Sequence, residues 1–171
     1  PDYTEGLSQD LTGVQIGIGV GAPFDDIHSD VTPLHADATA VFRDLGATVS
    51  EIEVPGASLA NDLQQILIKP EITMMMYNLL QRTSDISVDV LGTQDEGNMV
   101  PATRYLEATA LRGPVLEEHV HGVYGKVDVL FTPGLGGPVP TVKEMSSSDV
   151  AAISARYRND LRVIRFANYL G

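Results

Sequence analysis

Hydrophobic and polar residues alternate with a period of two from residue 14 to residue 20, where the chain reads VQIGIGV. This alternation follows the turn signal Leu11-Thr12-Gly13 and is typical of a β-strand. A second strand is predicted from Ala47 to Val54, ended by Pro55-Gly56. Its alternation slips near the middle, which predicts a bulge or a late start.

Between these two strands, apolar residues recur at helical spacing. Pro33 lies near the start of the predicted helix, where its missing N–H costs little, and Gly46 ends the helix. The spaced apolar residues are Leu34, Ala38, Val41, Phe42 and Leu45. A strand–helix–strand unit of about 40 residues predicts a parallel pair of strands, and therefore an α/β fold.

The middle of the chain is mostly helical in pattern. One helix is predicted from Ala57 to Ile68, interrupted at Pro70 and resumed from Glu71 to Arg82. A long helix is predicted from Pro101 to Tyr124, with a kink where Gly113-Pro114 falls inside it.

A short apolar run, Val129-Leu130-Phe131, predicts a third strand, and a loop rich in glycine and proline follows it up to Pro140. A buried strand that ends in such a loop is a common way to build a small cavity at the edge of a sheet. Residues 146–149 supply caps for a helix from Val150 to about Asp160. The tail from Leu161 to Gly171 is predicted to be a further helix or an extended run.

The composition fits a single globular domain. The chain has 171 residues, of which 43% are hydrophobic. Its net charge is −12, from 11 basic and 23 acidic residues, which argues against binding nucleic acid by electrostatic attraction. The one basic cluster is predicted to be a solvated or ion-paired helix face. It comprises Arg156, Arg158, Arg162 and Arg165.

The chain has no cysteine, which excludes disulfides, thiolate catalysis and cysteine-ligated zinc. No apolar run approaches the roughly 20 residues needed to span a bilayer, so we expect no membrane partner. A cytoplasmic protein without a cofactor is the simplest expectation.

Two motifs have structural explanations that are simpler than ligand binding. The letters of Gly17 to Ala22 fit the dinucleotide fingerprint, but these glycines lie within a strand and open no helix. A glycine-rich strand packed closely against a neighbour explains them better. The acidic loop before Pro33 is expected to be solvated and to bind no metal. Its candidate ligands would be Asp25, Asp26, His28 and Asp30.

Other reactive side chains also lack a catalytic setting. His119 and His121 point to nearly opposite faces of a helix, so we expect one ring to be partly buried and the other to be solvated. Residues 74–77, Met-Met-Met-Tyr, are predicted to belong to a helix core. No segment combines a nucleophile, a base and an oxyanion hole.

Several segments, in order, resemble the later half of enzymes of the amidase signature family. Pro1 to Tyr3 with Leu11 to Gly17 is similar to the family's entry into the strand after its signature. Phe42 to Ala47 and Val49 to Pro55 resemble its L-G-A and V-E-V-P pattern. Glu71 lies where many members carry a glutamate.

Three later segments continue this order. Tyr105 to Ala108, with Arg112 after it, resembles the family's Y-L-A helix, and Val127 to Pro133 resembles its D-V-L-L-T-P-T strand. Phe166 to Gly171 resembles the F-N-L-x-G run that precedes L-P-A-S-P. The resemblance covers nearly the whole chain and implies part of a mixed-sheet α/β amidase domain with flanking helices.

The resemblance also implies hydrolysis of a carboxamide C–N bond by a Ser–cisSer–Lys triad. That triad lies in a glycine- and serine-rich signature that this chain lacks, so no catalytic residue is assigned. Residues 1–171 are interpreted as one segment of an amidase domain, truncated at both ends and inactive alone. In the family the loop after the third strand approaches the substrate cavity, which makes Thr132, Gly134 and Leu135 candidates for lining it. Gly134 stands where a threonine is common.

Two alternatives stay open. One is the glutaminase subunit of a tRNA-dependent amidotransferase, although Asn78 to Asp85 replaces its usual R-[FY]-D-G segment. The other is a non-catalytic binding or scaffold module. The expected partners are a small-molecule amide and the remainder of the amidase domain, and a homodimer is a further alternative. No metal is expected.

Overall fold

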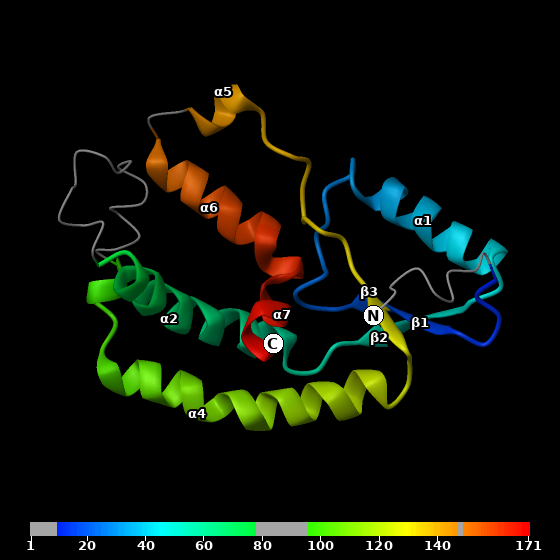
Figure 1. Ribbon diagram of the computed structural model, residues 1–171. Helices are drawn as coiled ribbons and strands as arrows, with labels where there is room; N and C mark the ends of the chain where they lie inside the picture. The colour runs from blue at the N-terminus through cyan, green and yellow to red at the C-terminus, as the bar shows by residue number, and fades with distance from the viewer. Residues whose placement is uncertain (1–9, 78–95, 147–148) are drawn as a thin grey trace, which may run out of the picture.

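A small parallel β-sheet lies among helices in the computed structural model, which describes residues 10–77, 96–146 and 149–171 (Figure 1). The strand order is β2-β1-β3, and both pairings are parallel. The strands are β1 (Gln15–Val20), β2 (Thr48–Glu53) and β3 (Val129–Phe131). The predicted α/β fold and the predicted parallel pair are confirmed.

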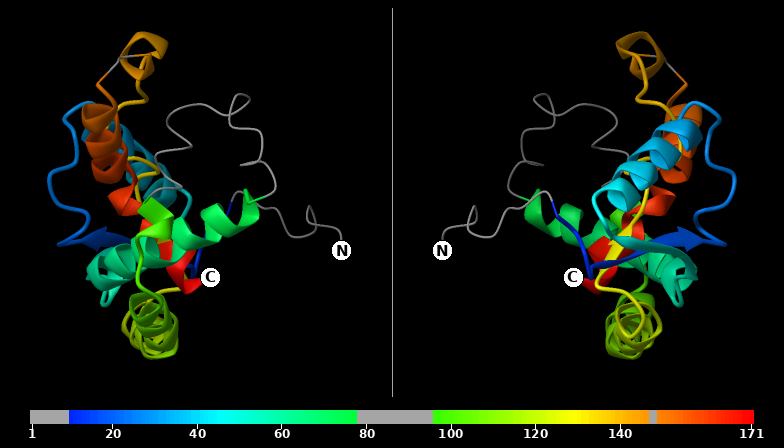
Figure 2. Two further views of the ribbon diagram at one scale, coloured as in Figure 1. Left: turned by 90° about the vertical axis from the view of Figure 1, so that its left-hand side faces the viewer. Right: turned by 90° about the vertical axis from the view of Figure 1, so that its right-hand side faces the viewer.

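Helices flank this sheet on both sides. α1 connects β1 to β2, α2 and α4 precede β3, and α5, α6 and α7 follow it. Their bounds are Thr32–Asp44 for α1, Ala57–Met75 for α2, Ala102–His119 for α4, Val142–Met145 for α5, Val150–Asp160 for α6 and Arg165–Leu170 for α7. α1 and α4 lie on opposite sides of the strands (Figures 1 and 2).

The central strand β1 carries glycine where it faces the main core. A Cβ atom on Gly17 would lie 2.6 Å from Cδ1 of Ile52, and one on Gly19 would lie 2.9 Å from the ring of Phe24. Both distances are too short for real atoms, so Ile52 and Phe24 lie directly over the strand backbone. This confirms the predicted glycine-rich strand packed closely against its neighbours.

The opposite face of the sheet packs against α1. Phe131 stacks on His35 with ring centroids 4.6 Å apart and meets Phe42 edge to face at 4.9 Å. Ile18 is the register partner of Phe131, so both side chains project from this face. Burial lowers the pKa of His35, which favours the neutral ring that stacks here.

The main core lies between the sheet and helices α2, α4 and α7. Phe24, from the loop after β1, meets Phe166 of α7 edge to face, with ring centroids 5.9 Å apart. Tyr169 is only 2% exposed, and its hydroxyl donates a hydrogen bond of 2.5 Å to the carbonyl of Ala108 in α4. α7 is thereby fixed to the loop after β1 and to α4.

Helix α2 continues through Pro70, so the predicted interruption there is wrong. A proline inside a helix removes one backbone hydrogen bond. α2 packs against both α4 and α7, and such tertiary packing supplies most of the stability of a helix in a protein. The predicted extension to Arg82 lies mostly outside the described residues.

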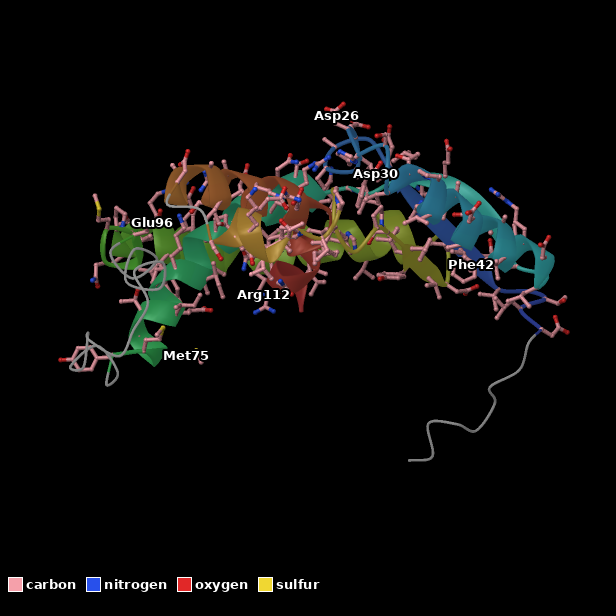
Figure 3. All side chains as sticks on the ribbon, turned by 90° about the horizontal axis from the view of Figure 1, so that it is seen from above. Asp26, Asp30, Phe42, Met75, Glu96 and Arg112 are labelled. Atoms are coloured by element: carbon pink, nitrogen blue, oxygen red, sulfur yellow. The ribbon has the colours of Figure 1, made fainter. Side chains whose placement is uncertain are left out.

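The exposed end of α2 contradicts a second prediction. Met74, Met75 and Tyr77 are 69%, 76% and 64% exposed, so this segment is not helix core. Figure 3 shows Met75 at the outer end of the helix. Apolar identity alone does not distinguish a core position from a helix end that extends beyond its packing partners.

The structure decides two smaller expectations, on β2 and on the end of the long helix. β2 begins at Thr48 and pairs residue by residue with β1 through Glu53, so it has the late start and no bulge. The long helix predicted to end at Tyr124 is α-helical only as far as His119, and Val120–Tyr124 forms a π-helical turn. Such turns are rare and mostly interrupt α-helices locally.

Side chains cap the two helices that follow the loop after β3. Asp149 accepts a hydrogen bond of 2.9 Å from the N–H of Ala152, as its position in the predicted cap implies. Thr141 and Glu144 form a reciprocal capping box at the start of α5. The backbone N–H of Thr141, its hydroxyl and then Arg156 lower the pKa of Glu144 to about 2.

The close packing of β1 predicts opposite effects for two glycine-to-alanine changes. Gly17→Ala should destabilise the fold by about 1–3 kcal/mol, because the added methyl group would overlap the buried side chain of Ile52. Gly113→Ala in α4 is the matched control, since its Cβ would have no neighbour within 4 Å. It should be neutral or stabilising by up to about 1 kcal/mol. Urea unfolding measures both, and equal effects would contradict the packing described for β1.

The capping box predicts a pH-dependent contribution from Glu144. Because its folded pKa of about 2 lies below its ordinary value of 4.5, the carboxylate stabilises the fold above pH 4.5, and this contribution is lost as the pH falls towards 2. Glu144→Gln should therefore be less stable than wild type near neutral pH, with a difference that shrinks in acid. Urea titrations across this range test it, with Glu51→Gln on the exposed side of β2 as control. A difference that does not change with pH would contradict the prediction.

Candidate functional site

The glycine-rich loop after β3 is held against the end of α6. The N–H of Gly136 donates to the carbonyl of Asp160 at 2.7 Å, and its carbonyl accepts from the N–H of His28 at 2.9 Å. Nη2 of Arg156 donates to the carbonyl of Pro138 at 2.9 Å. The loop backbone therefore has partners both in α6 and in the loop after β1.

Close approach explains two glycines in this loop. A Cβ atom on Gly136 would lie 2.5 Å from Nη1 of Arg162, and one on Gly137 would lie 2.8 Å from Oδ1 of Asp160. Asp160 is 8% exposed, and its carboxylate accepts a hydrogen bond of 3.2 Å from Nε of Arg156. Any larger side chain at these two positions would displace the loop from α6.

Strand β3 brings Thr132 to a cavity beside the core. Leu130 and Thr132 lie on the same side of the chain because side chains alternate along a strand, and Phe131 lies on the α1 side. Both residues line a cavity of about 340 Å³ between β3, the end of α4 and α7. Its volume is at the small end of the range for small-molecule sites.

His119 lines the same cavity and has an unsatisfied nitrogen. The residue is 4% exposed, and its ring lies 5.6 Å from that of Phe166 and 5.8 Å from that of Tyr124. Burial lowers its pKa, while a hydrogen bond with the backbone of Pro55 acts in the opposite direction. Nδ1 has no partner among the residues that the structure describes. The ring is therefore neutral near pH 7 and keeps one nitrogen without a hydrogen bond.

The sequence predicted that one of the rings of His119 and His121 would be partly buried, but it indicated neither which one nor its position at a cavity. His119 is buried and His121 is exposed, which confirms the predicted contrast. The cavity, however, is formed by elements that are far apart in the sequence, and the π-helical turn after His119 has no clear sequence signal.

The three residues predicted to line a substrate cavity lie in different environments. Thr132 is half-buried and lines the cavity described above. Gly134 is exposed, with open space where a Cβ would be. Leu135 is half-buried and does not line that cavity. Only Thr132 of the three is brought next to His119.

The backbone of the acidic loop after β1 is bound by Arg162, which lies in the 3₁₀ turn Leu161–Val163 that follows α6. Nη2 of Arg162 donates to the carbonyls of Asp25 and Asp26, the latter at 3.0 Å. Within residues 10–77, 96–146 and 149–171 there is no group of three or more potential ligands that could hold a metal ion. In the same part of the chain, no helix has the length and apolar character required to cross a bilayer.

Similar proteins include both amidases and components of amidotransferases. No protein-family model matches the chain. An amidase of Pseudomonas putida is 29% identical over 144 residues, covering 84% of this chain and 30% of the relative. A glutamyl-tRNA(Gln) amidotransferase subunit of Gloeobacter violaceus is 25% identical over 189 residues, covering 96% of this chain and 38% of the relative. The chain thus spans about a third of the length of these relatives.

Solved structures share the fold. A bacterial aryl acylamidase of the amidase signature family matches 83% of this chain and 31% of its own, with a TM-score of 0.65 and 21% identity. The allophanate hydrolase of Kluyveromyces lactis matches 96% of this chain and 26% of its own, with a TM-score of 0.74 and 15% identity. The sequence relatives and these shared folds together support membership of the amidase signature family.

Proposed function

We propose that these residues are the later segment of an enzyme that hydrolyses the C–N bond of a carboxamide to a carboxylate and ammonia or an amine. The observation that carries this proposal is the similarity to the Pseudomonas putida amidase over 84% of the chain. That match covers 30% of the relative, so most of a catalytic domain of that length lies outside the matched segment.

The lysines of this chain support a catalytic triad located outside it. Nζ of Lys69 lies 2.6 Å from the carboxylate of Glu96, while Lys126 and Lys143 are exposed. A lysine that acts as a base in catalysis needs an environment that disfavours its charged form. None of the three occupies such a buried position among the described residues, which supports placing the Ser–cisSer–Lys triad in another part of the protein.

The loop after β3 contributes the shape of the substrate cavity. Thr132 lines the cavity, and Gly134 and Leu135 follow it in the loop that leaves the cavity. The attachment of Gly136 and Gly137 to α6 keeps the rim in a fixed position. Chemistry then proceeds on the triad: a serine oxygen attacks the carbonyl carbon, the C–N bond breaks as the leaving nitrogen takes a proton, and water releases the carboxylate.

A second candidate function is the glutaminase component of a tRNA-dependent amidotransferase. The similarity to the amidotransferase protein of Gloeobacter violaceus, over 96% of this chain, favours it. The segment from Asn78 to Asp85 that counts against it lies outside the described residues. Ammonia release from glutamine, compared with ammonia release from simple alkyl and aryl amides, separates the two functions. Release from glutamine alone would favour the glutaminase component.

The location of the triad predicts that the 171-residue chain alone releases no ammonia from acetamide, benzamide or glutamine. A longer protein that includes the coding sequence upstream should release ammonia from at least one of them. Activity of the isolated chain would contradict the proposed location of the triad. Inactivity of the longer protein on all amides would instead favour a non-catalytic module.

The rim position predicts a substrate-binding role for Thr132. In the longer, active protein, Thr132→Val should raise KM or lower kcat/KM by about tenfold, the effect of one lost hydrogen bond. Val139→Ala is the matched control, because Val139 is a 79% exposed residue of the same loop. Steady-state kinetics measure both variants. Equal kinetics for wild type and Thr132→Val would remove Thr132 from the substrate site.

A further inference from the structure

A second, larger cleft lies away from the loop after β3. It has a volume of about 590 Å³ and is formed mainly by α2, α6 and α7, of which α2 and α7 pack against each other (Figure 1). It shares no lining residue with the cavity at Thr132. Its apolar lining includes Ile68, Ile153, Leu161 and Ile164. A cleft of this size suits a small molecule.

Three of the chain's 11 basic residues line this cleft, although the protein has a net charge of −12. Lys69 is paired with Glu96. Arg158 and Arg165 have no hydrogen-bond or ion-pair partner within the described part of the chain. The cleft therefore gathers two guanidinium groups that form no hydrogen bond or ion pair with the described residues.

The two neighbouring arginines of the same segment behave differently. Arg156 bonds to Glu144, Asp160 and the carbonyl of Pro138. Arg162 donates to carbonyls in the loop after β1 and to Asn159. These two guanidinium groups hold the fold together, so an absence of partners is not a general property of arginines here.

Arg158 and Arg165 also lie close enough for their charges to repel. The pKa of Arg165 is lowered first by burial and then by the charge of Arg158, while Asp62 acts in the opposite direction. Two like charges beside an apolar wall favour an anion between them. A guanidinium group binds carboxylates well because its planar N–H fork matches their geometry.

We propose that this cleft binds a monocarboxylate with an apolar body. Its carboxylate lies between Arg158 and Arg165, and its aryl or alkyl part packs against Ile153 and Ile164. Asn168 at the same wall supplies a neutral donor. This binding needs neither the triad nor the cavity at Thr132, so it can be tested independently of amide hydrolysis.

The test uses 4-phenylbutyrate as the probe and the 171-residue chain, with binding measured by calorimetry and NMR titration. Wild type should bind it, and added NaCl should weaken the binding because exposed charges are screened. Arg158→Gln and Arg165→Gln should each weaken it about tenfold. Arg104→Gln is the matched control, since Arg104 on α4 pairs with Glu107 and does not line the cleft.

Two further ligands separate the parts of the proposal. The neutral 4-phenylbutyramide should bind at least about tenfold more weakly than 4-phenylbutyrate. Inorganic phosphate should not compete at equal concentration, because it lacks an apolar body. The proposal would be overturned if the amide bound as tightly as 4-phenylbutyrate, or if phosphate competed with 4-phenylbutyrate at equal concentration. It would also be overturned if Arg104→Gln weakened binding as much as Arg158→Gln and Arg165→Gln do. Circular dichroism checks that each variant is folded. If Arg165→Gln is unfolded, the proposal is tested with Arg158→Gln, which changes an exposed residue, and with Ile153→Ala. Both variants should then weaken the binding of 4-phenylbutyrate.

Discussion

Direct packing of two side chains against the backbone of β1 determines how the rest of the molecule is arranged. Ile52 and Phe24 can occupy these positions only because Gly17 and Gly19 carry no Cβ. Phe24 in turn contacts Phe166, and through it the C-terminal helix is tied to the centre of the sheet. Because β1 carries no side chain at Gly17 and Gly19, other side chains can pack directly on its backbone. The three described strands therefore help to bury side chains that come from early and late in the chain.

In the loop after β3, glycines also allow a close approach of the backbone, here to polar groups. Gly136 and Gly137 let the loop backbone approach the end of α6, where the carbonyl and carboxylate of Asp160 lie. Arg156 then joins this carboxylate to the capping box of α5 through Glu144. A loop fixed by backbone hydrogen bonds and buried charge can present Thr132 in one position, which a substrate-facing residue requires.

The two hollows of the molecule have different chemistry. The cavity at Thr132 is lined by aromatic and aliphatic side chains with the unpartnered nitrogen of His119, and it borders the strand whose loop we assign to an amidase rim. The cleft between α2, α6 and α7 is amphipathic and basic. Arg156 and Arg162 bond to groups within the fold, whereas Arg158 and Arg165 line the cleft.

The sequence by itself determined the elements whose signals are local. Alternation identified β1, helical spacing identified α1, and Asp149 marked the start of α6, because each depends on neighbours within a few residues. Only the tertiary structure decided that α2 passes through Pro70, that Met75 is exposed, and that His119 and Thr132 share a cavity. Those outcomes depend on which distant surfaces meet, and a residue's burial is a property of its partners rather than of its own type.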